Sequence, residues 1–221
     1  MPIENTEELV RIPADGVTLE GDLVLPIAAS GIVVFAHGSG SSRHSPRNTF
    51  VARQLQLAGL GTLLFDLLTR HEDATYETRF DIALLTRRLE AATRWLQQQP
   101  RTGSLHLGYF GASTGAAAAL QAAATFGTQI GAVVSRGGRP DLALSALGQV
   151  EAPTLLIVGG EDHEVIILNR QAYRALHVAK ELLIVPGATH LFEEPGTLEE
   201  VARVAAQWFT QHLGAKPAVH A

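Results

Sequence analysis

The chain has 221 residues and a mass of 23.6 kDa, which is enough for one larger α/β domain with a sizeable core. Its 17 Lys and Arg against 22 Asp and Glu give a net charge of −5, and no basic cluster stands out, which argues against nucleic acid and anionic membranes as main partners. The complete absence of cysteine excludes disulfides, thiolate zinc sites, iron–sulfur clusters and a cysteine nucleophile.

The amino terminus gives no sign of export. Residues 1–10 are polar and acidic, without the basic and apolar regions of a signal peptide. No apolar run approaches the roughly 18 residues that a membrane helix needs. We therefore expect a soluble, cytoplasmic protein.

The first predicted elements are two strands joined by a tight turn. Leu9–Pro13 and Val17–Leu25 flank Ala14-Asp15-Gly16, a pattern typical of an amino-terminal hairpin. Six short runs rich in Val, Ile, Leu and Phe follow. Because they are apolar on both faces, they suit strands of a parallel sheet that is covered by helices on both sides. These runs are Gly31–Ala36, Gly61–Phe65, Ser104–Phe110, Ile130–Ser135, Thr154–Val158 and Glu181–Val185.

Helical patterns lie between the strands. Ser45 and Pro46 form a favourable helix start, because serine caps the first turn and proline fits its first position. Apolar residues from Ile82 to Leu96 recur at spacings of three and four, and Pro100 closes that helix.

The later helices complete the alternation of strands and helices. Thr114–Phe126 is rich in alanine and is predicted to pack closely on the sheet. Thr197 and Glu200 have the spacing of a capping box at the start of the last helix. The whole pattern predicts one α/β domain over residues 1–213, with a frayed tail at 214–221.

Ser113 lies in the most informative stretch of the sequence. A predicted strand ends in Gly-x-Ser-x-Gly, from Gly111 to Gly115, and a helix follows at once. A serine on such a sharp turn needs glycine two residues before and after it, where side chains would clash. The turn would project the hydroxyl at the carboxyl edge of the sheet, above a helix amino terminus that favours negative charge.

A serine nucleophile requires a general base and an acid that orients the base. Asp162 follows the predicted strand Thr154–Val158, and His190 follows the strand Glu181–Val185. The order Ser113, Asp162, His190 is the nucleophile, acid, histidine order of α/β-hydrolases.

Each of these three residues also has a simpler, non-catalytic explanation. Ser113 could only cap its helix, Asp162 could cap the helix that begins near Glu164, and His190 could be an ordinary loop histidine. Other residues of the same loop compete for the roles of acid and base: Glu161, Glu164 and His163.

The oxyanion formed on an acyl group needs two N–H donors. One is expected from the backbone of Thr114, the residue after the serine. The other is expected from Ser39 in the loop His37-Gly38-Ser39-Gly40, where glycines on both sides let its backbone turn inward. His37 itself is interpreted as structural.

Four motifs together resemble the α/β-hydrolase superfamily, and more closely its small, lidless dienelactone-hydrolase-like group. They are His-Gly-Ser-Gly at 37–40, Gly-Tyr-Phe-Gly-Ala-Ser-Thr-Gly at 108–115, Gly-Gly-Glu-Asp-His-Glu-Val at 159–165 and Gly-Ala-Thr-His-Leu-Phe at 187–192. The match covers about residues 20 to 213. The resemblance implies an eight-stranded, mostly parallel sheet, no cofactor and hydrolysis through an acyl-enzyme. No metal is expected, because His71-Glu72-Asp73 lacks the His-x-x-x-His spacing of a zinc protease. Dienelactone hydrolases proper use cysteine, so serine at 113 points to ester hydrolysis instead.

The predicted substrates are small. The polar segment Leu68–Thr78 is too short for a lid domain, so a shallow site for short-chain or bulky small esters is expected. Arg43 and Arg136 lie in loops at the catalytic edge, as does Arg139, and could bind a substrate carboxylate. The alternative is that these arginines pair with acids of the protein itself: Asp66, Asp81 or Asp141.

Other functions are left open. The same triad could serve an acyltransferase, thioesterase, perhydrolase or lactonase, and the fold could serve a non-enzymatic interaction protein. A dinucleotide site at Gly38-Ser39-Gly40 with Asp66 lacks the third glycine of its motif. The expected partner is a small-molecule ester, without nucleic acid or membrane, and a homodimer is left open.

Overall fold

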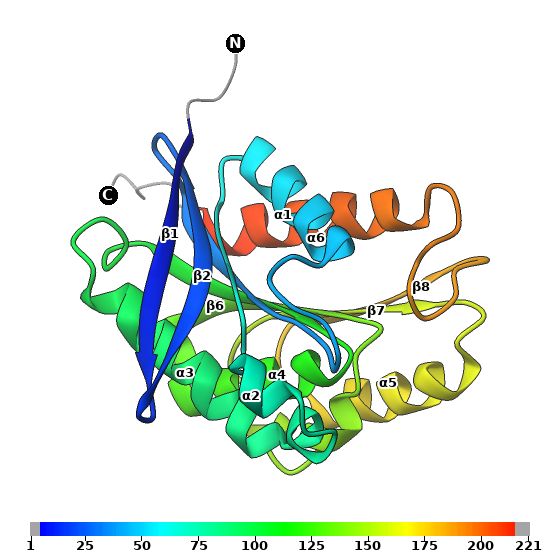
Figure 1. Ribbon diagram of the computed structural model, residues 1–221. Coiled ribbons are helices and arrows are strands. Elements are labelled where there is room, and N and C mark those ends of the chain that lie inside the picture. The colour runs from blue at the N-terminus through cyan, green and yellow to red at the C-terminus, as the bar shows by residue number, and fades with distance from the viewer. Residues whose placement is uncertain (1–4, 215–221) are drawn as a thin grey trace.

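An eight-stranded sheet forms the centre of the computed structural model, which describes residues 5–214 (Figure 1). The first two strands form the predicted hairpin, and the other six follow the predicted apolar runs to within two residues at each end. The strands are β1 (Asn5–Ala14), β2 (Val17–Pro26), β3 (Gly31–Ala36), β4 (Gly61–Phe65), β5 (His106–Ala112), β6 (Ile130–Arg136), β7 (Thr154–Gly159) and β8 (Lys180–Val185).

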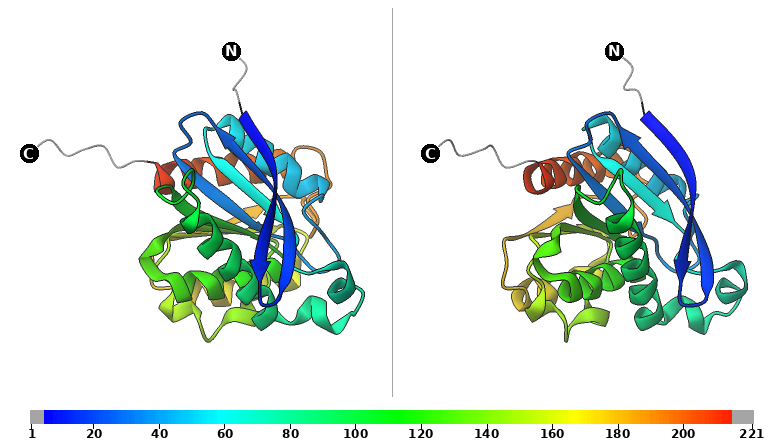
Figure 2. Two further views of the ribbon diagram at one scale, coloured as in Figure 1. Left: turned by 60° about the vertical axis from the view of Figure 1, so that its left-hand side comes forward. Right: turned by 90° about the vertical axis from the view of Figure 1, so that its left-hand side faces the viewer.

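The strand order is β1-β2-β4-β3-β5-β6-β7-β8. The hairpin strand β2 pairs antiparallel with both β1 and β4, whereas every pair from β4 to β8 is parallel. Figure 2 shows the hairpin at one edge of a strongly twisted sheet. The parallel strands all end at one edge, so the loops that follow β3, β5, β6, β7 and β8 gather there.

The helices cover both faces of the sheet, as the sequence predicts. Helices α1 and α6 pack together on one face, and α3, α4 and α5 lie on the other (Figure 1). Each layer has its own apolar core against the sheet. The helices are α1 (Pro46–Leu57), α2 (Arg70–Asp73), α3 (Ile82–Gln98), α4 (Thr114–Phe126), α5 (His163–Ala175) and α6 (Thr197–Leu213), with short 3₁₀ turns in the connecting loops.

Helix α4 lies unusually close to the sheet because its residues are small. A β-carbon added to Gly115 would lie 2.1 Å from the carbonyl oxygen of Ala36 at the end of β3. The four alanines that follow Gly115, at 116–119, are all fully buried. The small residues of α4 thus let its first turn, which follows Ser113, lie close to the end of β3.

The N-terminal cap of α6 differs from the predicted one. The capping box at Thr197 and Glu200 is wrong: Gly196, with a φ of 84°, takes the cap position, and the Thr197 hydroxyl donates to the carbonyl of Glu194 at 2.7 Å. A capping box does form at α2, between Thr69 and Glu72.

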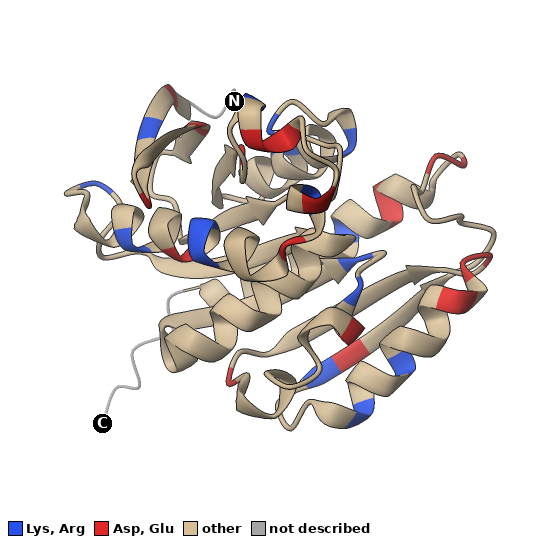
Figure 3. Ribbon diagram, turned by 60° about the horizontal axis from the view of Figure 1, so that its bottom comes forward, with Lys and Arg blue, Asp and Glu red and all other residues tan. Residues whose placement is uncertain are grey.

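Three of the general expectations concern membrane helices, surface charge and the tail. Within residues 5–214, no helix is long and apolar enough to cross a membrane. Acidic and basic residues are interspersed on the side drawn in Figure 3. The tail predicted as frayed lies outside the described residues, except for Gly214.

Candidate active site

Ser113 occupies a strained turn between β5 and α4. Its φ is 51° and its ψ is −122°, a region that residues other than glycine rarely adopt. The flanking glycines make the turn feasible, because a β-carbon on Gly111 would lie 2.4 Å from Cα of Ala116. The structure therefore provides the sharp strand-to-helix turn that the Gly-x-Ser-x-Gly pattern predicts.

The backbone of Ser113 is held by the last residue of β6 and by the loop that follows it. Its N–H donates to the carbonyl of Arg136 at 3.3 Å, and its carbonyl accepts from the N–H of Arg139 at 3.1 Å. The same loop contacts the histidine, since a β-carbon on Gly137 would lie 3.5 Å from Cε1 of His190. Residues 136–139 thus lie against both Ser113 and His190.

Asp162 and His190 are hydrogen-bonded to each other. Nδ1 of His190 lies 2.6 Å from Oδ2 of Asp162. A carboxylate only accepts, so Nδ1 carries the proton and Nε2 of the neutral ring keeps its lone pair. Asp162 precedes α5 but caps none of its N–H groups, which leaves its carboxylate for His190.

The exposure of the pair suits proton transfer at a substrate site. The side chain of His190 is 39% exposed, whereas that of Asp162 is 15% exposed. Among residues 5–214, no hydrogen bond joins the Ser113 hydroxyl to His190. Such contacts are often long in an empty site and shorten when substrate binds.

The loop after β3 approaches the serine from the other side. A β-carbon on Gly38 would lie 3.0 Å from Cβ of Ser113, so a side chain there would crowd the serine. The N–H of Thr114 belongs to the first turn of α4, where N–H groups have no partner within the helix. The N–H of Ser39 instead donates to Oγ1 of Thr114 at 3.0 Å.

This contact adds a detail to the predicted oxyanion site, whose two donors stay a prediction. Ser39 does lie beside Thr114, but its N–H already has an acceptor. The Thr114 hydroxyl is the acceptor of this N–H. The hydroxyl also joins the loop after β3 to the start of α4.

His37 has the structural role predicted for it. Its Nδ1 lies 3.0 Å from the carbonyl of Gly38, and its Nε2 accepts the N–H of Leu67 at 3.0 Å. Burial lowers the pKa of His37, although the hydrogen bond to Gly38 and the charges of Asp66 and Asp73 oppose it. A neutral His37 therefore braces the loop after β3 against the loop after β4.

The arginines behave mostly as in the alternative reading. Arg43 forms ion pairs with Asp66, with Glu20 at 2.8 Å and with Asp22 at 3.5 Å. Arg43 thus makes the pairing that the alternative describes, because the protein's own carboxylates surround its guanidinium. That Arg43 binds a substrate carboxylate stays a prediction. Arg139 likewise pairs with Asp141 at 2.8 Å, while Asp81 caps α3 and pairs with none of the three.

Arg136 is different, because it has no acidic partner in the described part of the chain. Its side chain is 7% exposed, and Nη2 lies 3.5 Å from Oδ1 of Asn48 in α1. Its Nε and Nη1 atoms have no hydrogen-bond partner. Burial, together with the charge of nearby Arg47, lowers the pKa of Arg136 to about 10.

Two contacts near the site leave no signal in the sequence. The buried Asn169 of α5 donates to the carbonyl of Gly138 at 3.0 Å and so holds the loop after β6. Glu194 accepts from both the N–H and the hydroxyl of Thr189, the residue before His190. The first contact joins residues 31 positions apart, and the second lies within the loop after β8.

No metal or nucleotide site is evident in the described residues. No group of three or more His, Asp or Glu side chains there is arranged to hold a metal ion. The loop Gly38-Ser39-Gly40 leads into α1 only at Pro46, so no helix amino terminus follows the glycines directly, as a dinucleotide site requires.

Comparison with known proteins agrees with this architecture. Residues 19–213 match the model of the dienelactone hydrolase family. A crystal structure of dienelactone hydrolase from Anabaena variabilis is 56% identical, with a TM-score of 0.93, and the match covers 95% of this chain and 99% of that one. Est1E from Butyrivibrio proteoclasticus shares the fold at 15% identity, with a TM-score of 0.80 over 92% of this chain and 98% of Est1E.

A curated relative from Mycobacterium tuberculosis carries the name phosphoribosyl transferase. It is 58% identical over 207 residues, which make up 94% of this chain but 47% of the relative. The chain therefore spans about half the length of the curated relatives that it matches. On the family match and on these identities, the chain belongs to the dienelactone hydrolase family, a group of α/β-hydrolases.

Proposed function

We propose that the protein is a serine hydrolase of the carboxylesterase type that cleaves small or short-chain esters. The observation that carries this proposal is the hydrogen bond between Asp162 and His190 at the same edge of the sheet as the strained Ser113 turn. Nucleophile, base and orienting acid are the three parts that acyl transfer by serine needs.

The proposed reaction has two halves. Nε2 of His190 accepts the proton of Ser113 as Oγ attacks the ester carbonyl carbon, and Asp162 stabilises the imidazolium that forms. The bond to the leaving oxygen then breaks, His190 returns the proton to that oxygen, and the alcohol departs. Water repeats the sequence on the acyl-enzyme: it gives a proton to His190, releases the acid and restores Ser113.

The oxyanion would form between the loop after β3 and the start of α4. The N–H of Thr114 is the proposed first donor. Ser39 is the proposed second, and it would have to share its N–H with the substrate oxygen or release the Thr114 hydroxyl. That Arg136 holds a substrate carboxylate also stays a prediction, supported by its two unpartnered nitrogen atoms.

The name of the mycobacterial relatives does not carry over to this proposal. The match covers 47% of their length, so phosphoribosyl transfer can belong to the part that this chain does not match. A serine, a histidine and an aspartate in this arrangement serve acyl transfer.

Hydrolysis of p-nitrophenyl acetate by purified variants tests the proposal. Ser113→Ala should lose activity by a factor on the order of 10⁴ or more, with an unchanged melting temperature. His190→Ala should do the same. Ser104→Ala and His106→Ala are matched controls, because both residues are exposed and lie before or at the amino end of β5, away from the site. Full activity in Ser113→Ala would refute the assignment.

A further inference from the structure

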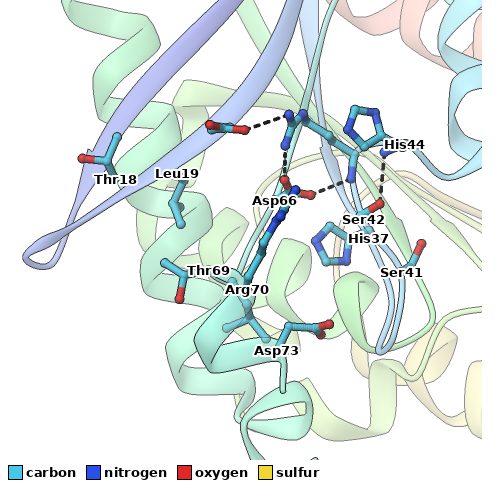
Figure 4. Close-up of a pocket in the computed structure, with 13 residues that line it drawn as sticks. Thr18, Leu19, His37, Ser41, Ser42, His44, Asp66, Thr69, Arg70 and Asp73 are labelled. Atoms are coloured by element: carbon cyan, nitrogen blue, oxygen red, sulfur yellow. Dashed lines mark hydrogen bonds and ion pairs between the residues drawn. The ribbon is translucent and has the colours of Figure 1, made fainter. Parts of the chain in front are cut away.

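A second feature of the catalytic edge is an open cavity of about 440 Å³ (Figure 4). Three segments enclose it: the start of β2, the loop after β3 and the loop after β4. The start of β2 lies at this edge because β2 runs antiparallel to β4, with Gly21 opposite Phe65. A volume in this range is typical of pockets for small molecules.

The cavity adjoins the proposed site without containing the triad. His37 lines it, and the same loop continues to Gly38, which lies against Ser113. An ester held at Ser113 could therefore extend past this loop into the cavity. The wall has an apolar part, formed by the buried Leu19 and Leu68.

The rest of the lining is rich in groups that form hydrogen bonds. The guanidinium of Arg70 and the hydroxyls of Thr18 and Ser41 have no partner among residues 5–214, so they are available as donors. Figure 4 shows Arg70 extending from α2 toward Asp66. Carboxylates of Asp66 and Asp73 line the same cavity and keep lone pairs beyond the contacts that they already make.

The charges of the lining nearly cancel. Arg43 and Arg70 face three acids, Glu20, Asp66 and Asp73, and Arg43 is already paired with two of them. A bare anion would meet these carboxylates, and a bare cation would meet the free guanidinium of Arg70. The ligand that fits is neutral and polar.

Because the lining offers both hydrogen-bond donors and acceptors, a neutral ligand needs groups that can both accept and donate hydrogen bonds. A hydroxyl donates one hydrogen bond and accepts others, and neighbouring hydroxyls on a ring present both together. An apolar wall at Leu19 and Leu68 suits the carbon face of such a ring.

We propose that this cavity binds the polyhydroxylated part of the substrate, so that the physiological ester is an ester of a sugar or a similar polyol. This inference rests on the proposed function in one respect: the cavity holds part of the substrate only if Ser113 is the residue that attacks the ester. The recognition itself is a property of the cavity and is measurable without turnover.

The test compares two acetate esters of similar size. One is 6-O-acetyl-D-glucose, and the other is cyclohexylmethyl acetate, which has the ring without hydroxyls. We expect kcat/KM of the wild type to be at least about tenfold higher for the sugar ester, the ratio that about 1.4 kcal/mol of hydrogen bonding gives. Arg70→Met should reduce kcat/KM for the sugar ester about tenfold and leave cyclohexylmethyl acetate within about twofold.

Arg53→Met is the matched control, because Arg53 is an exposed arginine of α1 outside the cavity. It should change neither rate. Equal kcat/KM for the two esters in the wild type would overturn the inference, and so would an equal loss on both in Arg70→Met.

A binding measurement separates this inference from the proposed function. Calorimetric titration of 6-O-acetyl-D-glucose into the Ser113→Ala variant should show binding that Arg70→Met weakens about tenfold. If p-nitrophenyl acetate is not cleaved by the wild type but this binding is seen, the proposed function fails and the sugar site stands. If the ester is cleaved but no sugar binding is seen, the sugar site fails alone.

Discussion

Gly115 is the position where one added methyl group should damage both stability and activity. A β-carbon there would lie 2.1 Å from the carbonyl oxygen of Ala36 and 2.5 Å from that of His37. Both atoms belong to the backbone and cannot rotate away. To restore an ordinary contact of at least 3.4 Å, the start of α4 would have to move away from β3 by roughly 1.3 Å.

The size of both effects follows from that displacement. Overpacking of this kind costs about 1–3 kcal/mol, so Gly115→Ala should lose at least about 1 kcal/mol of unfolding free energy in urea titrations. Because α4 carries Ser113 at its start and Ala36 leads into the loop at Gly38, the shift would also misplace the nucleophile. A misplacement near 1 Å can cost about 100-fold, so kcat on p-nitrophenyl acetate should fall by that order.

Gly148→Ala provides the matched control. A β-carbon on Gly148 would find its nearest neighbour 4.0 Å away, at His177. This variant should keep the stability and the activity of the wild type. If Gly115→Ala were as stable and as active as Gly148→Ala, the close approach of α4 to β3 would not be what positions Ser113, and the reasoning would be wrong.

Three further predictions concern single side chains. Burial and the charge of Arg47 lower the pKa of Arg136 to about 10, which corresponds to a penalty on the order of 3 kcal/mol for the charged form. Arg136→Met should therefore raise the unfolding free energy by about 1–3 kcal/mol, and a loss would contradict this. Thr114→Val should lower kcat about tenfold and Thr114→Ser should restore it, because the hydroxyl holds the N–H of Ser39; valine at or above wild-type activity would show that the hydroxyl blocks the site. Burial alone would raise the pKa of Glu72, but hydrogen bonds from Thr69 and the charge of Arg88 outweigh it and lower the pKa below 4.5. Its stabilising effect is therefore present above pH 4.5 and is lost as the pH falls through the lower folded value, so melting curves of wild type and Glu72→Gln should converge in acid.

The sequence predicts the sheet well because buried parallel strands carry a strong local signal. Runs such as Gly31–Ala36 and Gly61–Phe65 are apolar at nearly every position, and their observed bounds agree with the predicted ones. Helix α2 is missed, since four polar residues have no apolar periodicity, and only the capping pair Thr69 and Glu72 marks it. The capping pattern at Thr197 misleads because Gly196 adopts a left-handed backbone that no pattern specifies.

The candidate site is predictable in its order but not in its contacts. Parallel strands end at one edge, so residues just after β7 and β8 had to meet there, and Asp162 and His190 do. The contact between Ser39 and Thr114 joins residues 75 positions apart through a backbone N–H, which leaves no side-chain pattern. The ion pairs of Arg43 could not be predicted either, because they depend on which carboxylates the fold brings near its guanidinium.

The most direct test of the account is covalent labelling of the nucleophile. The wild type and His190→Ala would be incubated with a fluorophosphonate probe, and the adduct would be located by peptide mass spectrometry. We predict one adduct on Ser113 in the wild type and none in His190→Ala, because the hydroxyl depends on His190 for activation. Folded wild-type protein without an adduct, or with an adduct on another serine, would contradict the proposal that Ser113 is an activated nucleophile.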